Sequence, residues 1–364
     1  MCIRDRYIDE AIAEAENAEA GGSLYVAASK YFQALYYAYT KLYLLNALAN
    51  SSFIAVEAER ISKEAGKLID SVHSLTSRNM SLAELSVVIN VLDRVYEALV
   101  YLNNSLALSQ STDLHNLQNL QNAVVDLAYA KARLYTAELW SRFVDVVDSA
   151  DSDVISKESI GDVATYVIDL AKNVLAYTLS LAQSSQVQVP SELEEAEEYL
   201  SIAQSLSNDL DKLTVGIAAV SYMHRSLLSM FTKSYEHQLY TLNKTLHLNL
   251  ALIADTLIPV DAVLQLEFIK ELPDASSKII AMAKLSIVLA LYRTLYLTAV
   301  SKSRTTAQTR TEGLQTCMPI TVTITTTKTV TTTIVADRES YSLSMYALSA
   351  VLSALIISVV VIVI

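Results

Sequence analysis

The chain has 364 residues, 52% of them hydrophobic, with only six Gly and four Pro. Few breaks in regular structure are therefore expected, and long windows of Ala, Leu, Glu, Lys and Gln at helical spacing predict an all-α fold. The formal net charge of −12 and the absence of a basic cluster argue against nucleic acid as a partner, because binding to phosphates needs concentrated Lys and Arg.

The first six residues, Met1 to Arg6 ("MCIRDR"), resemble a translated sequencing adapter. We therefore interpret residues 1–6 as an artefact and expect the gene to begin further upstream. With Cys2 set aside, Cys317 is the only thiol. No internal disulfide and no Cys-based metal site are predicted.

Residues 23–49 follow a Gly21-Gly22 break and are rich in Tyr. Aromatic side chains recur seven, four, three and four residues apart and so share one helical face: Tyr25, Phe32, Tyr36, Tyr39 and Tyr43. Ala28, Leu35 and Leu42 lie beside them. We interpret this face as core packing, with Tyr hydroxyls at a polar rim.

The next helix has the clearest period, with apolar residues alternately four and three apart: Ile54, Ala58, Ile61, Ala65, Leu68, Val72 and Leu75. This pattern predicts a seam against an antiparallel neighbour or a short coiled coil. Ser81 and Glu84 then form a predicted capping box at the start of another helix. A further helix is predicted from about residue 113 to 147, and residues 7–147 are expected to form one helical bundle.

Two polar stretches interrupt the pattern, at residues 148–158 and 184–190. We assign 148–156 as a linker and 157–301 as a second helical bundle. Ser191 and Glu194 predict another capping box, followed by Glu residues that we interpret as a solvated acidic face. Residues 278–300 are predicted to be a buried helix, because Lys284 and Arg293 would each cost about 2.5–3.5 kcal/mol at the centre of a bilayer.

The composition changes near the end of the chain. In residues 320–335 Thr alternates with Val and Ile, which predicts a stiff extended stalk within a polar linker at 302–340. Residues 342–364, which begin with Ser342 and end with Ile364, carry no charge. A helix of this length crosses a bilayer core of about 30 Å, so residues 341–364 are predicted to be a transmembrane helix that contacts membrane lipid.

Four sequons suggest N-glycosylation, at Asn50, Asn79, Asn103 and Asn243. Together with the Thr-rich stalk, they favour a single-pass protein of the cell membrane whose bulk is extracytoplasmic. A homo-oligomer is left open.

Nothing in the sequence predicts a catalytic residue, a cofactor site or a metal site. The five His residues do not stand three or four residues apart, and the six Gly residues form no phosphate-binding loop or nucleophile elbow. Surface or capping roles are expected for all five: His73, His115, His224, His237 and His247.

Residues 11–48 ("AIAEAENAEAGGSLYVAASKYFQALYYAYTKLYLLNAL") resemble the helical hairpin that follows the protease domain in archaeal Lon-like serine proteases. The resemblance implies a lost N-terminal Ser-Lys endopeptidase domain, a helical region and, in many members, a C-terminal span. The catalytic motif of that family has no match here, so no catalytic residue is carried over.

Three functional interpretations follow. The first is a non-catalytic, membrane-anchored helical region that positions a lost Lon-like protease domain or its substrates. The second is a surface-layer anchor or stalk protein, whose partner is a surface-layer protein. The third is a helical ectodomain that senses a small ligand.

Overall fold

The computed structural model describes residues 2–75, 79–110, 117–144, 154–185 and 188–231, together with separate residues between 239 and 290. About 90% of this part is helical, which confirms the all-α class. The predicted stalk (302–340) and transmembrane helix (341–364) lie outside the described residues. None of the helices in the described part combines the length and the apolar character needed to cross a membrane.

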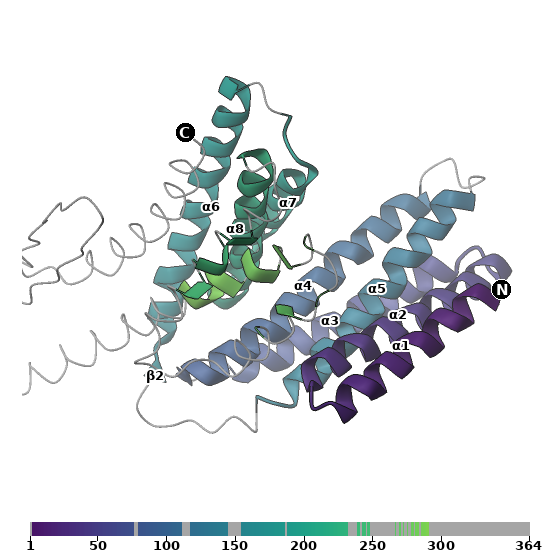
Figure 1. Cartoon of the computed structure of the whole chain (residues 1–364). Coiled ribbons are helices and arrows are strands. Elements are labelled where there is room, and N and C mark those ends of the chain that lie inside the picture. Colours follow the sequence, from purple (N-terminus) through teal and green to yellow (C-terminus); the bar gives the residue numbers. More distant parts are fainter. Residues whose placement is uncertain are drawn as a thin grey trace, which may run out of the picture.

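The first group of helices lies side by side (Figure 1). It consists of α1 (Cys2–Ala20), α2 (Leu24–Ala49), α3 (Phe53–Leu75), α4 (Leu82–Gln110) and α5 (Leu117–Ser141). Helix α4 packs along α5, α1 packs along α2, and α2 and α3 each also contact α5.

Helices α1 and α2 form a hairpin at the predicted glycine break. Gly22 has φ +80°, a backbone conformation that L side chains rarely adopt. The amides of Gly21 and Ser23 donate to the carbonyls of Asn17 and Ala18 at 3.0 and 2.9 Å. These bonds satisfy carbonyl groups at the end of α1, so the break is a defined cap.

The predicted seam of α3 is confirmed. Ile61, Ala65 and Val72 have no exposed surface, and Ile54 and Ala58 are buried with them. The face predicted for α2 is confirmed only in part. Tyr43 is buried, but Leu42 is 51% exposed. That part of the prediction is wrong because α2 carries apolar residues on more of its surface than its neighbours cover, and Leu45 and Leu48 are exposed as well.

The second group contains α6 (Lys157–Ser185), α7 (Ser191–Ser205) and α8 (Asp209–Phe231). Helix α8 packs against both α6 and α7. At the crossing of α6 and α8, a Cβ added to Gly216 would stand 2.9 Å from Val167 Cγ1, so the two helices approach closely. The sequence did not predict the break between α7 and α8, where the Leu210 amide donates to Asn208 Oδ1 at 2.9 Å.

A short strand pair joins the two groups. The strands β1 (Met80–Ser81) and β2 (Val154–Ile155) pair antiparallel, with Met80 opposite Ile155. The sequence predicted a capping box that begins at Ser81 in the first strand and part of a linker at the second. Two residues per strand are too few for an alternating pattern to appear in a sequence.

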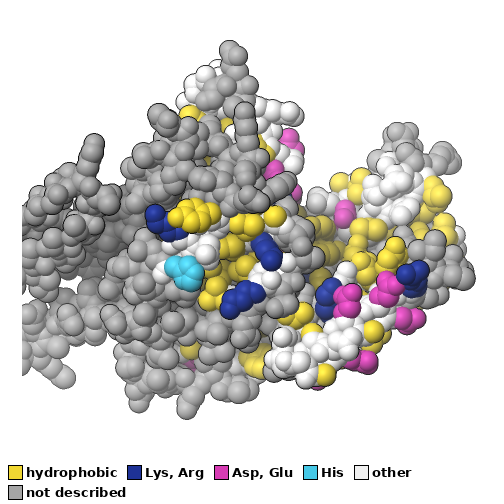
Figure 2. Space-filling view, in the orientation of Figure 1, with side chains coloured by type: hydrophobic (Ala, Val, Ile, Leu, Met, Phe, Trp, Pro, Cys, Tyr) yellow, Lys and Arg dark blue, Asp and Glu magenta, His cyan; other side chains and the backbone are white. Residues whose placement is uncertain are grey.

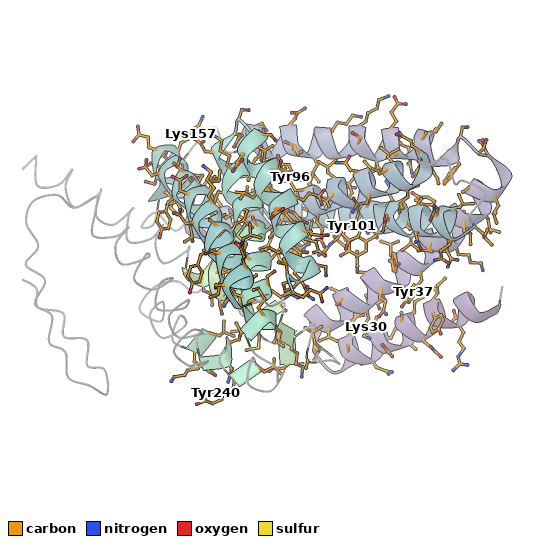
Figure 3. The ribbon with its side chains drawn as sticks, turned by 90° about the horizontal axis from the view of Figure 1, so that it is seen from above. Lys30, Tyr37, Tyr96, Tyr101, Lys157 and Tyr240 are labelled. Atoms are coloured by element: carbon orange, nitrogen blue, oxygen red, sulfur yellow. The ribbon has the colours of Figure 1, made fainter. Side chains whose placement is uncertain are left out.

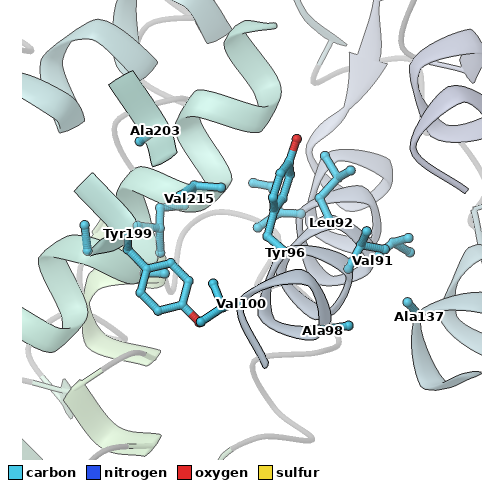
Figure 4. Close-up of a cluster of buried hydrophobic side chains, with 14 of the residues drawn as sticks. Val91, Leu92, Tyr96, Ala98, Val100, Ala137, Tyr199, Ala203 and Val215 are labelled. Carbon is cyan, nitrogen blue, oxygen red and sulfur yellow. The ribbon is translucent and has the colours of Figure 1, made fainter. Parts of the chain in front are cut away.

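The hydrophobic core is continuous across the two groups. Helix α4 contacts α8, and buried side chains of α4 lie opposite those of α7 and α8. Figure 4 shows this cluster, which includes Leu92, Tyr96, Val100, Tyr199, Ala203 and Val215. The two helix groups therefore share one core within the described residues, and the predicted division into 7–147 and 157–301 stays a prediction.

The predicted buried helix at 278–300 is helical at its described residues, which lie within 278–290. Leu285 and Leu289 are fully buried, and Ile287 and Val288 join the main core. Lys284 and Arg293 lie outside the described residues.

Candidate functional site

A cavity of about 480 Å³ lies where the two helix groups meet. Its described lining comes from α2, α4, α5, α7, α8 and three residues further along the chain: Ile269, Leu272 and Ala281. In the space-filling view, hydrophobic side chains occupy the recess between the groups, with charged side chains nearby (Figure 2).

Three helices each contribute lining residues that lie close to one helical face, at steps of three, one and three on α4 and α8 and of four, three and four on α5. On α4 the lining residues are Asn90, Asp93, Arg94 and Glu97; on α5 they are Tyr129, Arg133, Thr136 and Trp140; on α8 they are Ala218, Ser221, Tyr222 and Arg225. These steps keep each set close to one helical face. Each helix therefore presents one mainly polar or aromatic stripe to the cavity, while its apolar stripe enters the core.

A partly buried charged cluster forms the wall between α4 and α5. Arg133 Nη2 lies 2.5 Å from Glu97 Oε2, and the Tyr129 hydroxyl donates to Glu97 Oε1 at 2.8 Å. Glu97 Oε2 and Arg133 Nε are both buried atoms without a hydrogen-bond partner among the described residues. Burial, followed by the charge of Glu97, raises the pKa of Tyr129 well above its ordinary value, so this hydroxyl remains a donor.

Two further guanidinium groups line the cavity. Arg94 donates to the carbonyl oxygen of Asn90 at 2.8 Å, and its guanidinium lies 5.0 Å from the centre of the Trp140 ring. Arg225 forms an ion pair with Glu192 of α7 at 2.9 Å. This ion pair links α8 to the first turn of α7 beside the cavity.

Aromatic rings surround the charged groups. Tyr199 and Tyr222 stack with centroids 5.3 Å apart and planes 14° apart, while Phe32 meets Tyr129 edge-on at 5.7 Å. The guanidinium of Arg133 lies over Phe32 at 5.4 Å. The cavity therefore combines flat apolar surfaces with fixed hydrogen-bond donors, as small-molecule sites commonly do.

Tyr101 belongs to the same region without lining the cavity. Its ring lies 4.3 Å from that of Tyr129, and burial raises its pKa to about 12. Seen from above, Tyr96 and Tyr101 lie in the middle of the assembly and Tyr240 at its periphery (Figure 3).

The predicted glycosylation sites do not lie at the cavity. The side chains of Asn50, Asn79, Asn103 and Asn243 are all exposed, and none lines the cavity. They differ in the third sequon residue. Ser52 is exposed beside Asn50, whereas Ser105 has no exposed surface and donates to the carbonyl oxygen of Ala123 at 2.7 Å.

The described His residues differ from the predicted surface or capping roles in two cases. His73 on α3 lies 2.9 Å from Asp211 Oδ2 on α8, so it joins the two helix groups. His224 is half-buried, and burial lowers its pKa to about 4. His247 is exposed. His115 and His237 lie outside the described residues.

Within the described ranges, no three His, Cys, Asp or Glu side chains gather in a way that could hold a metal ion. The predictions of no catalytic residue, no cofactor and no metal remain predictions from the sequence.

Comparison of the chain with models of protein families, with curated proteins and with solved structures returned no match. The resemblance of residues 11–48 to Lon-like proteases therefore stands on the sequence alone. The cavity and its surrounding helices are the basis for assigning a function.

Proposed function

We propose that the described helices form a binding module that takes a small organic ligand into the cavity between the two helix groups. The carrying observation is the cavity itself: about 480 Å³, with guanidinium, carboxylate, hydroxyl and aromatic groups converging from five helices. Pockets for small molecules commonly measure about 300–1,000 Å³ and combine apolar walls with a few placed polar groups. This proposal develops the ligand-sensing interpretation of the sequence.

The position of the cavity also suits a sensor. Its walls belong to both helix groups, which meet through α4 and α8 and through the strand pair. A ligand that contacts both walls stabilises the arrangement in which they face each other, by an amount set by its differential affinity. Binding in the cavity would thus be coupled to the packing of α7 and α8 on α4.

Trp140 offers a direct test, because it is the only tryptophan of the chain and lines the cavity. Three probes share one naphthalene ring and differ in charge: naphthalene-2-carboxylate, 2-naphthylmethanol and 2-naphthylmethylammonium. We expect at least one of them to change Trp140 fluorescence in the purified full chain, saturably and with one site per chain.

A cavity-filling variant supplies the control. Thr136→Phe places a ring in the lining and should abolish the saturable signal, whereas Thr165→Phe on the exposed side of α6 should leave it unchanged. If no probe binds, or if Thr136→Phe binds as the unchanged chain does, the proposed function is wrong.

The protease-associated interpretation is compatible with a binding module. We propose that the module belongs to such a protease. In this view the helices are a non-catalytic, membrane-anchored region that positions a Lon-like domain or its substrates, and the sequence resemblance supports it. Sequencing the gene upstream of Tyr7 tests this proposal. A frame encoding a Ser-Lys protease domain supports it, and a signal peptide directly before Tyr7 eliminates it in favour of a separate surface protein.

A further inference from the structure

We propose that the cavity selects a planar aromatic carboxylate or a similar aromatic oxyanion, an inference that depends on the proposed function. The anionic group would be bound by the guanidinium groups of Arg133 and Arg225, and the ring would lie among the aromatic side chains of the lining.

The charge of the lining supports an anion. The described lining holds three Arg, at positions 94, 133 and 225, against two acids, Asp93 and Glu97, and includes no Lys or His. Three positive minus two negative charges leave a formal +1, in a chain whose formal net charge is −12. Positive charge is therefore concentrated here against the trend of the molecule, where it attracts a small anion.

Arg133 supplies a donor that lacks an acceptor. Its Nε is buried without a hydrogen-bond partner among the described residues, although its Nη2 meets Glu97. A buried donor without an acceptor destabilises the folded chain. A ligand oxygen could accept this hydrogen bond once the side chain turns its Nε toward the cavity, whereas a cationic ligand group cannot accept it.

Arg225 is only partly engaged. A guanidinium has five N–H donors, and the ion pair from its Nη2 to Glu192 Oε1 at 2.9 Å uses one side of the group. The side chain is 22% exposed, so it is accessible from the cavity. Guanidinium groups bind carboxylates through two parallel hydrogen bonds, which gives them selectivity for planar oxyanions.

Glu192 lies outside the lining and pairs with Arg225, so counting it brings the formal charge of the site from +1 to zero without making it negative. Burial raises the pKa of the neighbouring Glu195. The stacked pair Tyr199 and Tyr222 adds apolar area without charge, because burial raises the pKa of both hydroxyls.

The lining already pairs cations with rings. Arg133 lies over Phe32 at 5.4 Å and Arg94 over Trp140 at 5.0 Å. A planar ligand that carries a carboxylate on an aromatic ring complements both kinds of group. Its ring can stack on the aromatic lining while its carboxylate accepts hydrogen bonds from the guanidinium groups.

The charge series separates this inference from the proposed function. In the full chain, we expect naphthalene-2-carboxylate to bind at least about tenfold more tightly than 2-naphthylmethylammonium, with 2-naphthylmethanol between them. If the cationic or neutral probe binds in the cavity as tightly as the anion, the ligand class is wrong and the proposed function survives. If none of the three binds, both are wrong.

A charge-removing variant adds a second measurement. Arg225→Gln should weaken binding of the carboxylate about tenfold and leave binding of the neutral alcohol nearly unchanged. The matched control is Arg142→Gln, a 67% exposed side chain just after α5 and outside the lining, which should change neither affinity. An equal loss of both probes in Arg225→Gln would indicate a structural role and overturn the assignment of this side chain. The comparison of the three probes uses the unsubstituted protein, so it does not depend on whether any variant folds.

Discussion

At the scale of single residues, two ionisable groups lie in surroundings that oppose their charge. Burial raises the pKa of Asp126 on α5 to about 6 and lowers the pKa of His224 on α8 to about 4. In each case the fold favours the neutral form, so each group stabilises the folded chain only while it is uncharged. Their effects on stability have opposite slopes with pH.

Asp126→Asn tests the first of these groups. The folded pKa is above the unfolded value, so between about pH 4 and 6 the unfolded chain binds fewer protons and stability falls as pH rises. At pH 7 the amide should therefore raise the free energy of unfolding by about 1 kcal/mol, allowing for solvent screening. At about pH 2.5, where Asp126 is protonated in both the folded and the unfolded chain, urea unfolding should show little difference between the variant and the unsubstituted protein. A lower free energy of unfolding for Asp126→Asn at pH 7 would contradict this prediction.

The second residue-scale prediction concerns glycosylation. Asn50 is exposed and extended, with φ −144° and ψ 112°, and the Ser52 hydroxyl donates to its side-chain oxygen at 2.9 Å. Asn103 lies within α4, and its sequon hydroxyl on Ser105 is buried. In a host that glycosylates sequons of folded chains, we expect glycan at Asn50 and none at Asn103. Peptide mass spectrometry of the full chain, with Asn50→Gln as control, measures the glycan at both sites. Glycan at Asn103 and none at Asn50 would contradict this prediction.

At the scale of elements, the two predicted capping boxes have different outcomes. The first is confirmed: the Ser81 amide donates to Glu84 Oε2 at 2.8 Å and the Glu84 amide donates to Ser81 Oγ at 3.1 Å. The second is not formed, because α7 has Pro190 at its N-cap and no side-chain cap bond. Glu192 in that first turn pairs with Arg225 instead.

This difference predicts unequal responses to Ala. Ser81→Ala should lower the free energy of unfolding by about 1 kcal/mol, since it leaves a buried amide without its acceptor. Ser191→Ala should change it by less than about 0.5 kcal/mol. Denaturant unfolding of the two variants measures both values, and equal losses would mean that Ser191 has a capping role in solution.

The elements that the sequence predicted well are those that bury one face. The period of α3 identified Ile61 and Ala65 correctly because a single stripe faces the core. On α2, which is apolar on more than one face, the same reasoning placed Leu42 in the core although it is 51% exposed. Periodicity gives the phase of an apolar face only when there is one such face.

The cavity was not predicted from the sequence. Its three Arg residues lie on three helices separated by long stretches of chain, and each looks like an ordinary surface residue in its own window. The signal that was present is a polar and aromatic stripe at steps of three and four residues on α5, opposite the apolar stripe. Only the packing of α7 and α8 beside α4 shows that this stripe faces a cavity.

At the scale of the whole molecule, the shared core links the stability of the two helix groups. Met223 on α8 has no exposed surface, and Trp140 reports from α5 in the other group. Met223→Ala should lower stability by about 2–5 kcal/mol. Because the core is continuous, Trp140 fluorescence and helical circular dichroism should then shift together in one transition. Separate transitions would mean that the groups unfold independently.

The strand pair has a consequence for the order of folding. Residues 80 and 155 are 75 positions apart (155 minus 80), and α4 and α5 lie between them. Closing a flexible loop of that length costs about 4 kcal/mol, more than a two-residue ladder of hydrogen bonds returns at about 1 kcal/mol each. The pairing becomes favourable only after α4 and α5 have docked and brought its ends together. We therefore expect these four residues to pair late in folding, after the helices have assembled, and not to form the folding nucleus.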